Sequence, residues 1–202
     1  EGAIWADHWA YVDPVKHSQP QVIDSNWPTH WIDRFTLADI KKNQLKPAPD
    51  AAPITIVRRL HFDLTGLPPT PQEVTNFATN PSPRAYASLI DDLLASPHFG
   101  ERMTAYWLDL VRYADTVGYH GDQPHNISPY RDWVINAFNQ NMPFDQFTRE
   151  QLAGDLLPGS TTQQKVASGY NRLLQTTHEG GLQIKEYDAI YAADRVRNGS
   201  EV

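Results

Sequence analysis

Four side chains able to bind a metal ion or transfer a proton lie close together in the segment LVRYADTVGYHGDQPHN, Leu110 to Asn126. The segment begins with a helical pattern and continues into a loop interrupted by glycine and proline. Carboxylates and imidazoles in such a loop can converge on a divalent ion. Asp115, Asp122 and His120 are therefore candidate metal ligands, with calcium as one ion and His125 as a further candidate. The competing interpretation is that the loop is polar because it faces water.

Charged residues on the helices around this loop form a candidate buried polar network. Asp109, Arg112 and Asp115 are spaced to lie near one helical face. Arg131 is suited to bind a carboxylate or sulfate, or to pair with a neighbouring acid. Asp194 falls on the apolar side of the last predicted helix, where a carboxylate needs a partner such as an arginine from elsewhere. The network candidates are Asp109, Arg112, Asp115, Arg131, Asp132, Asp194 and Arg195.

Two further histidines lie on predicted helices. His61 falls on an apolar side, between Val57 and Leu64, where a hydrogen-bonded core histidine is the ordinary interpretation. His98 follows Pro97 at a helix start, where a capping role is expected. The sequence contains no Walker loop, GxGxxG, GxSxG, HExxH or CxxCH motif. Whether the protein is an enzyme therefore stays open at this stage.

Composition restricts the class of protein. The 202 residues are 40% hydrophobic and 11% aromatic, which is enough for a sizeable core. The net charge of −7, with eleven Arg and six Lys scattered along the chain, argues against nucleic-acid binding. There is no cysteine, so disulfides and covalent haem attachment within this chain are excluded. No apolar run approaches the roughly 20 residues of a membrane span.

Hydrophobic periodicity predicts an all-α fold, an irregular bundle of about seven or eight helices. The patterns begin near Ile32 and end near Val196, and no segment alternates as a strand does. Capping boxes at Thr70/Glu73 and Thr161/Gln164 mark two helix starts. Residues 33–202 are expected to form one helical domain. Residues 1–32, rich in Trp and Pro, are expected to form an extended arm anchored by its aromatic side chains.

Three long motifs resemble the planctomycete cytochrome c family domain, the PSCyt type. They are LHFDLTGLPPTPQEV, LIDDLLASPHFGERMTAYWLDLVRYADTVGY and YRDWVINAFNQNMPFDQFTREQLAGDLLP, and the similarity covers roughly residues 8–197. Members of this family of unknown function are large exported proteins that also contain c-type cytochrome modules. The resemblance implies an extracytoplasmic location, upstream and downstream domains of the same polypeptide as partners, and polysaccharide breakdown as a context.

The resemblance also implies where haem would lie. Residues 1–5 look like the tail of an upstream cytochrome module, and the run DRVRNGSEV resembles the segment that leads into a haem-attachment motif. Haem c would then belong to the parent protein, outside this chain. The similarity weakens around LLQTTHEGGLQIKEY, which puts any role for His178 or Glu179 in doubt.

Three functions remain open on these grounds. In the first, the domain packs beside a haem and supports electron transfer or haem-linked oxidation. Its haem-proximal or ligand candidates are His120, His125, Tyr119, Tyr130, Trp133 and Trp107, because CxxCH supplies one axial nitrogen. In the second, the region Asp115–Asp132 binds carbohydrate or calcium, with hydrolysis as a variant. In the third, the domain is an interaction scaffold.

Overall fold

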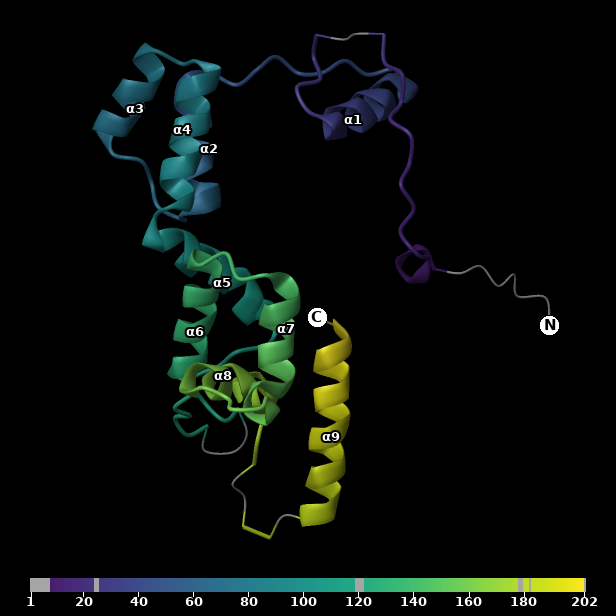
Figure 1. Ribbon diagram of the computed structural model, residues 1–202, viewed down its shortest axis with the longest axis vertical. Helices are drawn as coiled ribbons and strands as arrows, with labels where there is room; N and C mark the ends of the chain where they lie inside the picture. Colours follow the sequence, from purple (N-terminus) through teal and green to yellow (C-terminus); the bar gives the residue numbers. More distant parts are fainter. Residues whose placement is uncertain (1–7, 24–25, 119–121, 178–179, 182, 202) are drawn as a thin grey trace, which may run out of the picture. The chain divides into compact units, whose positions relative to one another are not determined.

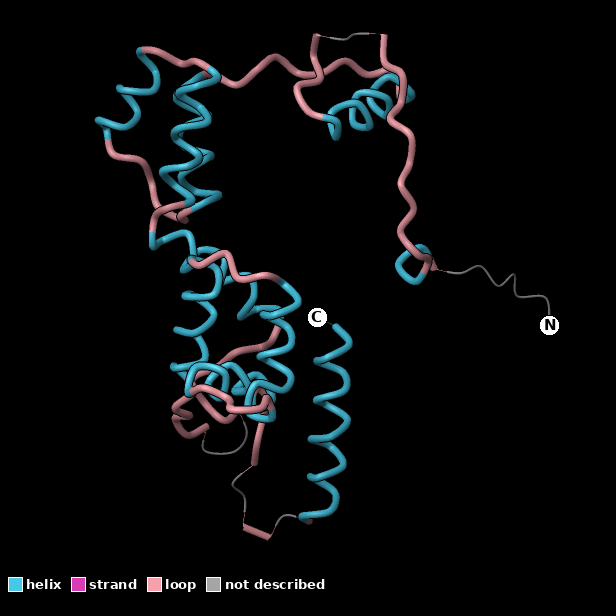
Figure 2. Tube along the Cα trace, in the orientation of Figure 1, coloured by secondary structure: helices cyan, strands magenta, loops and turns pink. Residues whose placement is uncertain are grey.

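The computed structural model describes residues 8–23, 26–118, 122–177, 180–181 and 183–201. Nine α-helices and three short 3-10 helices lie in this part of the chain, where the only β-structure is two isolated bridges (Figures 1 and 2). The all-α prediction is confirmed, with nine helices where seven or eight were expected. The helices are α1 (Trp31–Lys42), α2 (Pro53–Leu64), α3 (Pro71–Thr79), α4 (Pro83–Leu94), α5 (Pro97–Leu110), α6 (Ser128–Asn139), α7 (Phe144–Ala153), α8 (Thr162–Ala167) and α9 (Ile184–Glu201), with η1 (Trp9–Tyr11), η2 (Gly154–Leu156) and η3 (Ser168–Arg172) as the 3-10 helices.

Local sequence signals set where most of these helices begin. Proline occupies the first turn of α2, α3, α4, α5 and α6, where its missing N–H costs no hydrogen bond. Both predicted capping boxes are present, at Thr70/Glu73 and Thr161/Gln164. At α5 the cap is Ser96, whose hydroxyl accepts from His98 N. The capping role expected of His98 is therefore wrong, and its ring instead contacts Glu101 at 2.8 Å.

The chain divides into two compact units, Glu1–Asp50 and Ala51–Val202. In the first unit, α1 begins with a capping box in which Asp33 accepts from the backbone of Thr29 and His30. An extended segment lies before α1, and a hollow of about 590 Å³ is lined by Val15, Lys16, His17, Gln19, Trp31 and Phe35. Trp31 and Phe35 of α1 therefore line the same hollow as residues 15–19, and the anchoring of the arm by its aromatic side chains stays a prediction.

The core of the second unit is built mainly from α6, α7 and the turns after them. Tyr130, Trp133 and Phe147 are almost fully buried, and the rings of Trp133 and Phe147 stack with centroids 5.3 Å apart. The buried cluster consists of Val111, Ile127, Tyr130, Trp133, Val134, Ala137, Phe147, Ala167, Tyr170 and Leu173. These side chains hold the ends of α5 and α6 in place around the loop between them.

A close approach of α5 to α6 depends on Gly100. Its N–H donates to Asn139 Oδ1 at 2.8 Å, and Asn139 Nδ2 donates to the Pro97 carbonyl at 3.1 Å. A Cβ atom at Gly100 would lie 2.5 Å from the carbonyl oxygen of Ile135. Only a residue without a side chain lets the two backbones lie this close.

Candidate functional site

The helix α5 ends earlier than its periodicity suggested, and this changes which residues share a face. Its last residue is Leu110, and Arg112 has a left-handed φ of 59°. The expectation that Asp109, Arg112 and Asp115 lie on one helical face is therefore wrong. Arg112 instead directs its guanidinium to α9, where Nη1 and Nη2 donate to the two carboxylate oxygens of Asp194, each at 3.0 Å. Arg112 is thus the arginine partner of Asp194.

The other network candidates form short local contacts. Tyr113 Oη donates to Asp115 Oδ1 at 2.7 Å. Burial, together with this hydrogen bond to a carboxylate, raises the pKa of Tyr113 to about 12. Arg131 donates to the adjacent Asp132 at 3.1 and 3.2 Å, and this contact raises the pKa of Arg131.

Two more of the candidates are placed at the surface. Asp109 is exposed, and so is Arg195, whose Nε donates to the carbonyl of Asn171 at 3.2 Å. Of the seven candidates, Arg112 pairs with Asp194 and Arg131 with Asp132, while Asp115 contacts Tyr113 and Arg195 a backbone carbonyl; several lie at the surface, and the seven do not form one buried network.

The loop after Asp115 is organised by backbone hydrogen bonds. His125 N donates to the Asp115 carbonyl at 2.7 Å, and Gly118 N donates to Asp122 Oδ1 at 2.9 Å. Hydrogen bonds from the Thr116 hydroxyl and from Gly118 N lower the pKa of Asp122. Tyr119 and His120 lie outside the described residues. Among the residues that are described, no three His, Asp or Glu side chains gather where they could hold one metal ion.

One pocket of about 220 Å³ lies where this loop meets the segment after η3, and we call it the junction pocket. Three basic side chains line it, Arg112, His125 and Arg172, and no Asp or Glu among the described residues does. The rest of its lining is Ala114, Thr116, Val117, Gly118, Leu173, Leu174 and Gln175. This composition suits a negatively charged group.

The aromatic haem-proximal candidates lie mainly in the core. Trp107 Nε1 donates to both Tyr130 Oη and Gln151 Oε1 at 3.0 Å, and Tyr130 Oη donates to the same Gln151 oxygen at 2.6 Å. Burial raises the pKa of Tyr130. Trp133 is 4% exposed and stacks on Phe147, whose ring also meets Trp107 edge-on at 4.9 Å.

A smaller cavity of about 100 Å³, the α7–α9 cavity, joins this aromatic cluster to the C-terminal turns of α9. It is lined by Trp107, Phe144, Thr148, Gln151, Leu152, Tyr170 and Gly199. Phe144 and Leu152 are 67% and 51% exposed, so the cavity is bordered by an apolar surface. Trp107 lines this cavity, whereas His125 lines the junction pocket. These two haem-proximal candidates therefore line different pockets.

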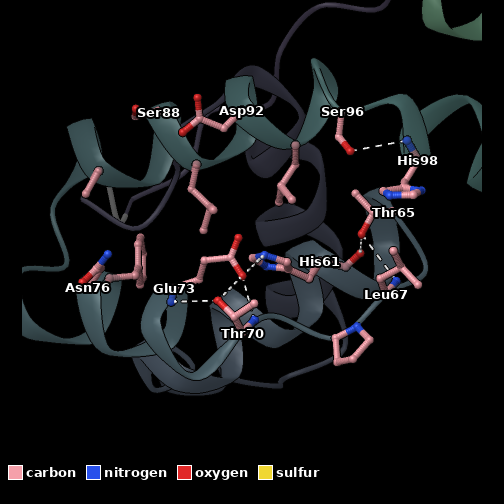
Figure 3. Close-up of a pocket in the computed structure, with 15 residues that line it drawn as sticks. His61, Thr65, Leu67, Thr70, Glu73, Asn76, Ser88, Asp92, Ser96 and His98 are labelled. Carbon is pink, nitrogen blue, oxygen red and sulfur yellow. Dashed lines mark hydrogen bonds and ion pairs between the residues drawn. The ribbon is translucent and has the colours of Figure 1, made fainter.

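A further hollow lies elsewhere in the same unit, between α2, α3 and α4 (Figure 3). This α2–α4 groove has a volume of about 660 Å³ and combines apolar walls with a polar floor. Figure 3 shows His61 and Glu73 side by side, with Ser88 and Asp92 of α4 across from them. The lining is His61, Thr65, Leu67, Pro68, Thr70, Glu73, Asn76, Phe77, Ala85, Ser88, Leu89, Asp92, Leu93, Ser96 and His98.

His61 and Glu73 are both held by fixed hydrogen bonds. His61 is 5% exposed, and its Nδ1 lies 3.0 Å from the Val57 carbonyl. Glu73 Oε2 accepts from Thr70 Oγ1 and Thr70 N, each at 2.7 Å, and these bonds lower the pKa of Glu73. His61 Nε2 lies 3.6 Å from Glu73 Oε2, beyond hydrogen-bond distance, and has no hydrogen-bond partner.

Sequence reasoning placed His61 as a hydrogen-bonded core residue but did not connect it with Glu73. The capping box identifies Glu73 as a residue at a helix start, and the apolar pattern of α2 predicts that His61 is buried. What was missing is the path of the loop Gly66–Thr70, which returns α3 alongside α2 and brings the two side chains together.

No helix among the described residues has both the length and the apolar character needed to cross a bilayer. A family model described as "PSCyt2: Protein of unknown function (DUF1549)" matches residues 31–202. No curated protein and no solved structure gives a significant match.

Proposed function

The chain belongs to the PSCyt2 family, a family of unknown function, and we propose that it serves as an anion-binding helical domain of a larger, exported c-type cytochrome protein. The binding site is the junction pocket. The observation that carries the proposal is the presence of Arg112, His125 and Arg172 in one pocket that is lined by no Asp or Glu of the described chain.

The charge of the pocket comes mainly from Arg172. The charge of Arg112 is offset by its bidentate contact with Asp194. Arg172 makes no ion pair with another described residue, which leaves its guanidinium for a ligand. A planar guanidinium binds a carboxylate or sulfate through two parallel hydrogen bonds.

The size of the pocket limits what it holds. Pockets that enclose a whole small molecule usually measure about 300–1,000 Å³. At about 220 Å³, the junction pocket suits one charged group, with the rest of the ligand outside. Because the family resemblance implies polysaccharide metabolism, the ligand we propose is a sugar that bears a carboxylate or a sulfate.

A titration of the full 202-residue chain tests this function. Sodium glucuronate and glucose 6-sulfate are added at low ionic strength, with glucose as the neutral comparison, and backbone amide shifts around Thr116 and Gln175 are followed. We expect saturable shifts with the two anions and none with glucose. Arg172→Ala should weaken binding about tenfold, the size of one lost charged hydrogen bond, whereas Arg149→Ala, at an exposed position of α7, should not. Equal responses to glucose, or an unaffected Arg172→Ala variant, would exclude the proposal.

The α7–α9 cavity supports the haem context of the same proposal. Gly199 contributes to a cavity with Trp107 and Phe144, so the last turn of α9 lies beside an apolar, aromatic surface. Such a surface fits the flank of a haem of the parent protein, which would supply the redox chemistry. Phe144 and Leu152 would exclude water there. No described histidine lines this cavity, so these residues fit a flanking role and not axial ligation.

The haem context is tested in the parent protein. A c-type α band on reduction is expected, and Leu152→Ser should shift the reduction potential because it makes the flank more polar. Leu94→Ser is the matched control, since Leu94 is 43% exposed and lies on α4. Absence of haem from the parent would overturn this context while leaving the anion titration of the isolated chain unaffected.

A further inference from the structure

We propose that a second anion-binding pocket adjoins the junction pocket, and that the two together bind an oligosaccharide with negatively charged groups on neighbouring sugars. This inference rests on the anion-binding function proposed above and specifies the substrate class of that site. The second pocket, which we call the η3 pocket, has a volume of about 270 Å³ and is lined by residues from the start of α6, from α8 and from η3.

The two pockets adjoin along two segments of the chain. In the first segment, His125 lines the junction pocket and the next residue, Asn126, lines the η3 pocket. In the second segment, Leu173 lines the junction pocket, Gly169 lines the η3 pocket, and Arg172 lines both. Because consecutive Cα atoms are only about 3.8 Å apart, one extended ligand can reach both pockets.

The η3 pocket has the same sign of charge as the junction pocket. Lys165 and Arg172 line it, and among the residues that the structure describes no Asp or Glu does. Neither of these two side chains forms an ion pair with another described residue. The chain as a whole has 24 acidic side chains against 17 Lys and Arg. Two adjoining pockets that are lined by basic side chains therefore differ from the rest of this acidic chain, and they favour a ligand with more than one negative charge.

Arg172 can bind a charged group in each pocket. A guanidinium has five N–H donors in one plane, and more than one of its edges can bind a carboxylate or sulfate through two parallel hydrogen bonds. The side chain of Arg172 is exposed and lines both pockets, so one edge can serve each of them. Two anionic groups need a second positive charge, and Lys165 supplies it in the η3 pocket.

The uncharged lining of the η3 pocket suits a sugar. Asn126 Oδ1 accepts from Ser128 Oγ at 3.3 Å, which leaves Asn126 Nδ2 to donate to a ligand. Pro129 and Val166 add apolar surface beside the polar groups, a mixture that is typical of sites for small molecules. Like the junction pocket, the η3 pocket is smaller than the roughly 300 Å³ at which a pocket encloses a whole small molecule. Each pocket therefore suits one charged group of a ligand that extends across both.

The experiment is a titration of the full 202-residue chain with three sugar acids at low ionic strength. Galacturonate is a single sugar with one carboxylate, lactobionate is a disaccharide acid with one carboxylate, and digalacturonate has one carboxylate on each of its two sugars. We expect digalacturonate to bind about tenfold or more tightly than the other two, because its second charged group binds at a high effective concentration. Digalacturonate should also shift the backbone amides around Lys165 together with those around Thr116 and Gln175.

A lysine variant tests the η3 pocket directly. Lys165→Ala should weaken the binding of digalacturonate about tenfold, the size of one lost charged hydrogen bond. It should leave the affinity for galacturonate unchanged, because a single group occupies the junction pocket. The matched control is Lys185→Ala, which removes the same charge from an exposed position of α9 that lines neither pocket and should change neither affinity.

Two results would overturn the second pocket while leaving the single-group function intact. One is equal affinity of the wild type for digalacturonate and lactobionate, which decides the question even where a variant fails to fold. The other is a folded Lys165→Ala variant that binds digalacturonate as tightly as the wild type does. No response to either galacturonate or digalacturonate would contradict the proposed function and this inference with it. A response to digalacturonate alone, weakened by Lys165→Ala, would support the two-pocket site and contradict binding of a single charged group.

Discussion

Arg112 and Asp194, 82 residues apart in sequence, form a bidentate contact in which both N–O distances are 3.0 Å. Their side chains are 42% and 21% exposed, so the contact is partly shielded from water. It joins the end of α5 to the middle of α9. Because the left-handed backbone at Arg112 directs the side chain there, the early end of α5 is what makes this connection.

Weakening this contact should loosen α9. Asp194→Asn and Arg112→Lys are each expected to lower the free energy of unfolding by about 1 kcal/mol, since the pair is bidentate but only partly buried. Urea unfolding of both single variants and the double variant gives the coupling between them. If the two effects simply add, the pair contributes no interaction of its own.

Two glycine-to-alanine substitutions in helices should have opposite effects. Gly100→Ala places a Cβ 2.5 Å from the Ile135 carbonyl oxygen and 2.6 Å from Asn139, so α5 and α6 must separate. We expect a loss of about 2–3 kcal/mol. At Gly199 of α9 the added carbon would have no described atom within 4 Å other than the neighbouring backbone of its own helix, so Gly199→Ala should stabilise the protein by about 0.5–1 kcal/mol. Thermal unfolding of both variants checks this, and a tolerated Gly100→Ala would contradict the close helix crossing.

The stabilisation due to Glu73 should depend on pH. Hydrogen bonds from Thr70 place the pKa of Glu73 in the folded protein below its ordinary value of 4.5. The charged group therefore stabilises the fold above pH 4.5, and this contribution is lost as the pH falls through the lower, folded pKa. Glu73→Gln keeps an acceptor for Thr70 but removes the charge at the start of α3, which is worth about 0.3–1 kcal/mol.

The Glu73→Gln variant should have a lower free energy of unfolding than the wild type at pH 7. The two free energies should be equal at the lowest pH at which both proteins remain folded. Chemical unfolding at a series of pH values measures the difference. A difference that stays constant from pH 7 to pH 3 would argue against a lowered pKa.

Helix positions could be predicted from the sequence because their signals are local. A capping box acts within one turn, and the starts of α3 and α8 follow from the two capping boxes in the sequence. The end of α5 was not anticipated, since the apolar stripe continues to Tyr113 while the backbone turns at Arg112. Periodicity reports which side chains are apolar and not where the backbone hydrogen bonds stop.

The sites could be predicted only in part, because they depend on contacts between distant segments. Asp194 was recognisable as a carboxylate in need of an arginine, but eleven arginines were available. The junction pocket combines His125 with Arg172, and the α2–α4 groove combines His61 with Glu73. Neither pairing has a spacing that resembles a known motif, so both required the paths of the connecting loops.

The way α9 is attached has a consequence for local unfolding. The side chains of α9 are mostly exposed. Its contacts with the rest of the second unit include the Arg112–Asp194 pair and a hydrogen bond from Thr177 N to the Tyr191 hydroxyl. Arg195 also donates to the Asn171 carbonyl, and Asn198 is buried. These are few and mainly polar contacts, so α9 can detach while the apolar core around Trp133 stays intact. Amide hydrogens of α9 should then exchange with solvent through a low-energy opening, whereas those of α6 should exchange only when the whole unit unfolds.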